Sequence, residues 1–181
     1  MKVIAFTGMP LSGKTEAVEI AKSMSIPVVR MGDMVWGEVQ KRGLELTDEN
    51  VGSVAGQMRK QHGKDIWALR TLEKIRLMGE MESVVIDGVR NVEEIEAFKK
   101  ELGDDFVVIA VEASSETRWR RALERGRADD NKDIKLVEER DRRELGWGLG
   151  VVMASADVVV SNEGGLKEFR RRIRDLLSKF R

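Results

Sequence analysis

A phosphate-binding loop is indicated near the start of the chain by the residues Gly8, Met9, Pro10, Leu11, Ser12, Gly13, Lys14 and Thr15. Glycines let the backbone turn its N–H groups toward a phosphate, and a helix that follows adds the positive end of its dipole. In this spacing the lysine reaches the β- and γ-phosphates and the threonine hydroxyl ligates Mg²⁺. A strand-like run before the loop and a helical pattern after it disfavour an ordinary glycine turn. The loop therefore predicts a nucleoside triphosphate ligand, with ATP and Mg²⁺ as the expected pair.

A second acidic element of such a site is predicted at Asp87, which follows the apolar run Ser83-Val84-Val85-Ile86. An aspartate at the end of a core strand can hold the Mg²⁺ shell, usually through water. The alternative is an aspartate that only caps the end of a strand. Because the phosphate-binding loop is present, the metal role for Asp87 is preferred.

Arginines that could stabilise a transferring phosphoryl group are concentrated in the second half of the chain. Arg118, Arg121 and Arg125 are spaced to share one helical face, and Arg127, Arg140 and Arg143 follow. The transferring group spreads negative charge over three oxygens, and arginine meets such oxygens with paired donors. The alternative is a solvated helical face in which arginines pair with glutamates.

Five strand-like runs, at about 1–7, 27–31, 83–86, 106–111 and 156–160, alternate with helical patterns. This alternation predicts an α/β fold, a three-layer sandwich with a five-stranded parallel sheet covered on both faces. The length favours one domain over residues 1–181.

Two segments do not belong to the alternation. Residues 33–80 have a helical pattern that we expect to break at Gly43, Gly52 and Gly63, and residues 126–145 begin with a polar stretch. Insertions of this kind lie over the carboxyl ends of the strands, where substrates bind. We expect the first to bind the acceptor and the second to act as a lid that expels water.

The composition excludes several classes of protein. Lys plus Arg and Asp plus Glu both number 32, so a protein that mainly coats nucleic acid or anionic membrane is not expected. The chain has no cysteine and one histidine, which excludes thiol nucleophiles and histidine-pair metal sites. No apolar run approaches the ~20 residues of a membrane span. We expect a cytoplasmic protein whose partner is a small molecule.

Further motifs resemble those of adenylate kinases and other nucleoside monophosphate kinases. Arg30-Met31-Gly32-Asp33-Met34 resembles the Gly-Asp-Met element that opens their acceptor domain, and Asp87-Gly88-Val89-Arg90 resembles their Asp-Gly-x-Pro-Arg, one residue shorter. The resemblance implies that Arg90 grips an acceptor phosphate. Arg121 and Arg125 resemble the Arg-x-x-x-Arg that begins their lid, which implies that the first covers the ATP base and the second reaches the phosphates.

Residues 156–164, ADVVVSNEG, resemble the Ala-Asp-x-x-x-x-Asn-x-Gly of dephospho-CoA kinases. That resemblance places Asn162 and Gly164 beside the adenine, and it implies that Asp33 orients or deprotonates an acceptor hydroxyl. The alternative role for Asp33 is a helix N-cap. Together these motifs cover nearly the whole chain, which is closest to archaeal P-loop proteins related to both kinase families.

One position departs from the adenylate kinase pattern. Trp36 stands three residues after Asp33, where those kinases have an arginine that binds the acceptor phosphate. Arg59 is a candidate to supply the missing charge, and Trp36 is a candidate to stack on a ring. The second half of the predicted lid also differs from the adenylate kinase signature.

The sequence thus predicts an ATP-dependent phosphotransferase that moves the γ-phosphate of Mg·ATP to a small acceptor, first of all a nucleoside monophosphate. Dephospho-CoA is the alternative acceptor, and a regulatory ATPase acting on a protein or ribonucleoprotein is an alternative of another class. The predicted catalytic residues are Lys14, Asp33, Arg125 and Arg127. The predicted acceptor-binding residues are Asp33, Trp36, Arg59, Arg90, Arg140 and Arg143. Arg121, Asn162 and Gly164 join residues 8–15 in nucleotide binding, with Thr15 and Asp87 at the metal.

Overall fold

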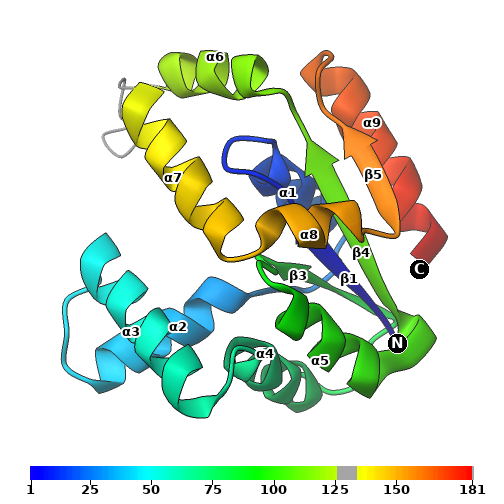
Figure 1. Cartoon of the computed structure of the whole chain (residues 1–181). Coiled ribbons are helices and arrows are strands. Elements are labelled where there is room, and N and C mark those ends of the chain that lie inside the picture. The colour runs from blue at the N-terminus through cyan, green and yellow to red at the C-terminus, as the bar shows by residue number, and fades with distance from the viewer. Residues whose placement is uncertain (126–133, 181) are drawn as a thin grey trace.

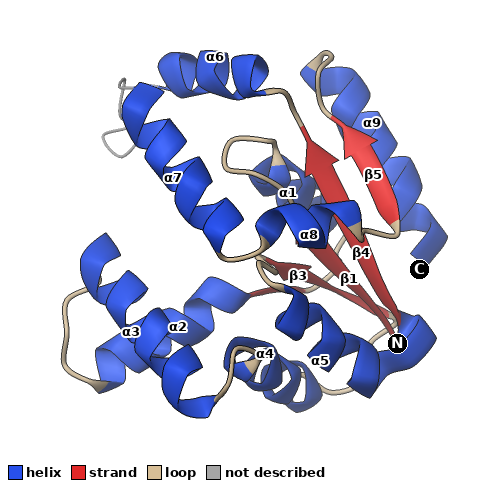
Figure 2. Cartoon of the chain, viewed as in Figure 1, coloured by secondary structure: helices blue, strands red, loops and turns tan. Residues whose placement is uncertain are grey.

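A computed structural model gives the architecture of the chain and describes residues 1–125 and 134–180. Five parallel strands form one sheet in the order β2-β3-β1-β4-β5, with helices on both faces (Figures 1 and 2). This confirms the predicted α/β fold. The strands are β1 (Lys2–Thr7), β2 (Val28–Arg30), β3 (Ser83–Asp87), β4 (Phe106–Glu112) and β5 (Val158–Ser161).

The central strand β1 is buried on both faces because its residues alternate between two cores. Val3 and Ala5 join one hydrophobic cluster, while Ile4 and Phe6 join the other. From β1 the chain moves to β2 at one edge of the sheet, and from β3 it crosses to β4 on the other side of β1. This topological switch point lies beside β1, where ligands of open α/β sheets bind at the carboxyl ends of the strands.

The helices divide between the two faces in agreement with the two clusters. The face that holds Ile4 and Phe6 is covered by α1 (Lys14–Ser23) and α9 (Leu166–Leu177). The opposite face is covered by α2 (Met31–Lys41), α3 (Asp48–His62), α4 (Ile66–Leu77), α5 (Val92–Leu102) and the short α8 (Leu149–Ala154). Two further helices, α6 (Ser115–Arg125) and α7 (Ile134–Gly146), extend past the loop that precedes α1 (Figure 1).

The 31–77 region contains three helices, and one predicted break within it is wrong. Gly43 follows α2 and Gly63 ends α3, as expected, but α3 runs without interruption through Gly52. A glycine inside a helix costs only about 1 kcal/mol. Burial of Val54 and Met58 in the core offsets that cost. The sequence also gave no expectation of α8, which buries Leu149 and Val152.

In the described part of the chain, no helix is long and apolar enough to cross a bilayer.

Candidate functional site

The loop between β1 and α1 has a backbone shape that requires glycine at two positions, Gly8 and Gly13. Gly8 has φ +147° and a Cβ there would lie 2.4 Å from the Val111 carbonyl oxygen. Gly13 has φ +115° and a Cβ there would lie 2.2 Å from Asn162 Nδ2. Leu11 also has a positive φ, of 65°, which is uncommon for a residue with a side chain. The loop therefore has a backbone conformation that differs from that of an ordinary turn.

Side chains from distant parts of the chain hold the carbonyl groups of this loop. Arg121 on α6 donates to the carbonyl oxygens of Leu11 at 3.3 Å and Ser12 at 3.1 Å, and to that of Asn162 at 2.6 Å. The Asn162 amide donates to the Ser12 carbonyl at 2.8 Å. Two residues predicted to contact ATP thus form part of the support of the phosphate-binding loop.

Arg118 connects the same loop to α7. Its guanidinium donates to the Pro10 carbonyl at 3.2 Å and makes two bonds to the Asp141 carboxylate, at 2.8 and 2.6 Å. Both side chains of this pair are largely buried. Sequence analysis placed Arg118 in the arginine stripe but missed Asp141. Nothing in the spacing joins two residues that lie 23 positions apart.

Lys14 begins α1 and points back to the loop. Its Nζ donates to the Gly8 carbonyl at 2.5 Å and to the Met9 carbonyl at 3.3 Å. Burial lowers the pKa of Lys14 to about 8, because the loop removes water from the ammonium group. A phosphate placed against Nζ would favour the charged form again.

Four other charged groups influence the pKa of Lys14 electrostatically. Asp87 and Glu144 raise its pKa, whereas Arg90 and Arg140 lower it. Asp87 ends β3 beside β1, Arg90 follows three residues later, and the other two are on α7. The structure thus brings predicted nucleotide, metal and acceptor residues to one edge of the sheet.

The loop and its surroundings fit Mg²⁺ with a nucleotide. The glycines let Val111 and Asn162 pack directly against the loop backbone, and the buried Ser12 hydroxyl has no hydrogen-bond partner among the described residues. Thr15 lies in the first turn of α1 and Asp87 at the end of β3. Among the described residues, no group of three or more acidic or histidine side chains could hold a metal alone. Thr15 and Asp87 are the residues that would hold Mg²⁺, together with phosphate oxygens.

Three of the predicted acceptor-binding arginines meet at Trp147. The guanidinium carbons of Arg59, Arg90 and Arg143 lie 5.7, 5.6 and 5.6 Å from the centre of the indole ring. They come from α3, from the turn after β3 and from α7. We call these four residues the Trp147 cluster. Sequence analysis did not select Trp147, and its position is the largest addition that the structure makes to the predicted site.

Buried carboxylates orient two of these arginines. Arg59 pairs with Glu94 at 3.3 Å and Arg90 pairs with Glu144 at 3.1 Å. Burial raises the pKa of Glu94, and the charge of Arg59 opposes that shift. Arg143 has no carboxylate within ion-pair distance among the described residues. The cluster therefore carries three cations and two anions, and its excess positive charge suits an anionic ligand.

Asp33 and Trp36 lie in the first two turns of α2. Asp33 is exposed, and its alternative role as an N-cap is wrong, because Arg30 occupies the cap position. Trp36 is 41% exposed and has the Arg30 guanidinium over its ring at 5.3 Å. Sequence analysis did not select Arg30.

The remaining predicted residues are placed as follows. Arg125 is the last residue of α6, Arg140 is exposed on α7, and Gly164 is exposed just before α9. Arg127 lies outside the described residues. Beside Gly164, the Glu163 carboxylate accepts a bond from the Thr117 hydroxyl at 2.7 Å, which fastens this loop to α6.

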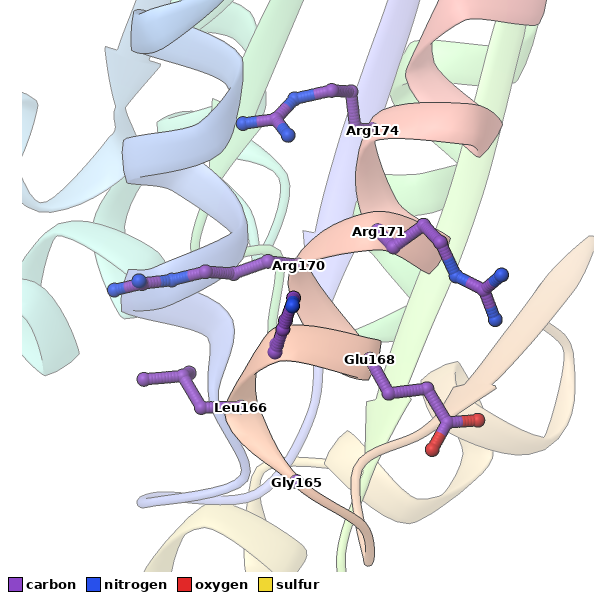
Figure 3. A pocket seen from close by; sticks show the side chains of 7 residues that line it. Gly165, Leu166, Glu168, Arg170, Arg171 and Arg174 are labelled. Atoms are coloured by element: carbon purple, nitrogen blue, oxygen red, sulfur yellow. The ribbon is translucent and has the colours of Figure 1, made fainter.

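A hollow in the described surface runs along the first turns of α9, next to Gly164 (Figure 3). It is lined by Gly165, Leu166, Lys167, Glu168, Arg170, Arg171 and Arg174.

Comparisons with known proteins agree with the fold. Residues 7–135 match a protein-family model described as AAA domain. Solved structures of similar fold include TT1252 from Thermus thermophilus (18% identity, TM-score 0.65, covering 98% of this chain and 97% of that one). A gluconokinase from Sinorhizobium meliloti is also similar, with 18% identity and a TM-score of 0.60; the match covers 98% of this chain and 92% of the gluconokinase. A shikimate kinase from Acinetobacter baumannii has 13% identity and a TM-score of 0.58; the match covers 99% of this chain and 92% of the shikimate kinase. At these identities the likeness carries the fold alone.

Archaeal relatives are much closer in sequence. A UPF0200/UPF0201 protein of Archaeoglobus fulgidus is 51% identical over 180 residues, and the chain spans just over half of its length, 56%. A UPF0200 protein of Methanosarcina barkeri is 44% identical over 180 residues, which are 99% of this chain and 96% of that protein. The chain therefore belongs to the UPF0200 family, and its nucleotide-binding P-loop core has a kinase-like fold.

Proposed function

We propose that the protein transfers the γ-phosphate of Mg·ATP to a small acceptor that carries an anionic group. The observation that carries the proposal is the nearness of two sites. Lys14 in the phosphate-binding loop lies within electrostatic range of Arg90, which belongs to the Trp147 cluster. A donor phosphate at the first site and an acceptor anion at the second would meet at the carboxyl edge of the sheet.

The chain's own residues supply positioning and charge. Lys14 meets the β- and γ-phosphates, and Arg140 and Arg143 on α7 have guanidinium groups available for the transferring group. When bound, Mg²⁺ would neutralise phosphate charge from a position shared by Thr15 and Asp87. In this proposal Asp33 orients or deprotonates an acceptor hydroxyl, and no base is needed if the acceptor oxygen already belongs to a phosphate.

The first candidate acceptor is a nucleoside monophosphate and the second is dephospho-CoA. Both carry phosphate groups that the excess charge of the Trp147 cluster can bind. The gluconokinase and shikimate kinase among the structural neighbours are named for small-molecule acceptors, which supports transfer to a small molecule in general.

The decisive experiment measures ADP formation from Mg·ATP against a panel of acceptors. The panel contains all ribo- and deoxynucleoside monophosphates, dephospho-CoA, shikimate, gluconate and a control without acceptor. We expect one acceptor to raise the rate at least about a hundredfold, equivalent to near 3 kcal/mol of transition-state stabilisation.

If every rate equals that of the control, phosphotransfer to these acceptors is excluded. ATP hydrolysis that does not depend on an acceptor would then favour the regulatory ATPase. The next measurement would be ATP hydrolysis in the presence of candidate macromolecular partners.

A further inference from the structure

Arg30 lies at the carboxyl end of β2, directly opposite Asp87 in the sheet register. Its Nε is 3.8 Å from the Asp87 carboxylate, which is at the outer limit of an ion pair. Because Asp87 lies next to β1 and acts on Lys14, Arg30 borders the same edge as the phosphate-binding loop.

The hydrogen-bonding capacity of Arg30 is unused. In the described residues its guanidinium donates no hydrogen bond, and its side chain is half exposed. Arg59 and Arg90, by contrast, each contact a buried glutamate at 3.3 Å or less. A guanidinium has five donors in a fork that matches phosphate or carboxylate oxygens. Arg30 is thus a cation at the site with its donors available.

Trp36 holds this free guanidinium in place. The Arg30 guanidinium carbon lies 5.3 Å from the centre of the indole ring, within the range of a cation–π contact. Stacking on a ring orients a guanidinium without using its N–H groups. The ring therefore orients the guanidinium, and among the described residues none of its N–H groups makes a hydrogen bond.

Binding of Mg²⁺ near Asp87 would change the partner of Arg30. A divalent cation near Asp87 would repel the Arg30 charge from that carboxylate, since like charges at close range are unfavourable. The guanidinium would then need another anion. The negative charge of an acceptor is the group that becomes available when both substrates are present.

We propose that Arg30, held by Trp36, binds the phosphate group of the acceptor. The inference rests on the proposed function and adds a specificity-determining residue to it: acceptors with a phosphate monoester are selected over uncharged ones. Trp36 acts as a positioning residue, through Arg30.

Isothermal titration calorimetry tests this with Mg²⁺ and a non-hydrolysable ATP analogue present. The protein is titrated with each of the four ribonucleoside monophosphates and with the corresponding nucleosides. For the monophosphate that binds best, Arg30→Gln should weaken binding at least about tenfold, because a charged bidentate contact is lost. Binding of the nucleoside, and of the ATP analogue itself, should change less than about twofold, since neither contacts Arg30 in this proposal.

Conservative variants separate binding from folding. Arg30→Lys should recover part of the loss, Trp36→Phe should bind as the wild type does, and Trp36→Ala should weaken binding about threefold. Arg70→Lys is the matched control. Arg70 also lies over an indole, that of Trp67 at 5.4 Å, and pairs with Glu38 at 2.8 Å, but it is in α4. It should leave monophosphate affinity unchanged.

Equal monophosphate affinity in Arg30→Gln and wild type would overturn the inference and leave the proposed function standing. A loss of ATP-analogue affinity as large as that for monophosphate would also overturn it, because Arg30 would then act through its ion pair with Asp87 on nucleotide binding. Failure of the wild type to bind any monophosphate would overturn the inference together with the first-ranked acceptor.

Discussion

Two regions of the molecule are rich in arginine, and they differ in how the arginines are held. On α9 the basic side chains, among them Arg170, Arg171 and Arg174, extend outward from the helix (Figure 3). The carboxylates that they reach are partly or largely exposed: Arg172 pairs with Glu168, and Arg170 pairs with Glu16. In the Trp147 cluster the carboxylates are buried, with exposures of 1% for Glu94 and 5% for Glu144.

This difference separates binding machinery from solvated surface. An exposed pair contributes little and leaves its side chains free to move. A buried carboxylate fixes the direction of its arginine, so that the guanidinium is organised before a ligand arrives. Both regions bring several arginines together in space, and the burial of their partner carboxylates distinguishes them.

The largest expected effect contrasts two lysines. Lys14→Met should reduce turnover of ATP by about a thousandfold, because a preorganised cation at the phosphates is lost. Lys167→Met, which removes an exposed lysine of α9, should leave turnover unchanged. Steady-state ADP formation with the best acceptor measures both. Full activity in Lys14→Met would remove the assignment of the phosphate-binding loop.

The second contrast compares ion pairs. Asp141→Ala should lower the free energy of unfolding by about 3 kcal/mol, because Arg118 would remain buried without its partner. Glu168→Ala on α9 should lower it by no more than about 0.5 kcal/mol. Urea denaturation gives both values. A double variant, Arg118→Met with Asp141→Leu, should recover most of the loss, and a loss in Asp141→Ala as small as in Glu168→Ala would erase the contrast.

A third contrast concerns the acceptor. Arg90→Ala should raise the acceptor KM about thirtyfold and the ATP KM less than about threefold, because Arg90 belongs to the Trp147 cluster. Arg174→Ala should change neither constant. Initial rates over a grid of both substrates provide the measurement. Equal effects of Arg90→Ala on the two constants would take Arg90 out of the acceptor site.

The smallest effect is a pH dependence from Lys14. Its pKa of about 8 in the free protein would rise when phosphate binds, so binding takes up a proton above pH 8. ATP affinity should therefore fall about tenfold from pH 7 to pH 9. Fluorescence titration at both pH values measures this. Lys14→Met should show no such fall.

Lys14 affects the free energy of unfolding with a pH dependence opposite to its effect on ATP affinity. The unfolded chain, with Lys14 near 10.5, binds more protons than the free folded protein between pH 8 and 10.5. The contribution of Lys14 to stability therefore rises with pH across that window. Urea titrations of the nucleotide-free protein, compared with Lys14→Met, would expose this difference.

Features carried by contiguous residues could be predicted from the sequence. The phosphate-binding loop, the five strands and the alternation of strands with helices depend on neighbours within a few positions. The Trp147 cluster could not be predicted, because Arg59, Arg90 and Arg143 come from three separate elements and no pattern in the sequence joins them. Asp141 and Arg30 were missed for the same reason: a partner across the fold gives each its role.

The contact between Gly13 and Asn162 has a consequence for biosynthesis. Asn162 fixes the Ser12 carbonyl across 150 positions of sequence, and Arg121 joins them both. A nascent chain therefore carries the complete loop sequence long before it carries the residues that shape it. The support of the loop is complete only after residue 162 has emerged and β5 has joined the sheet, so the nucleotide site reaches its final shape late in folding.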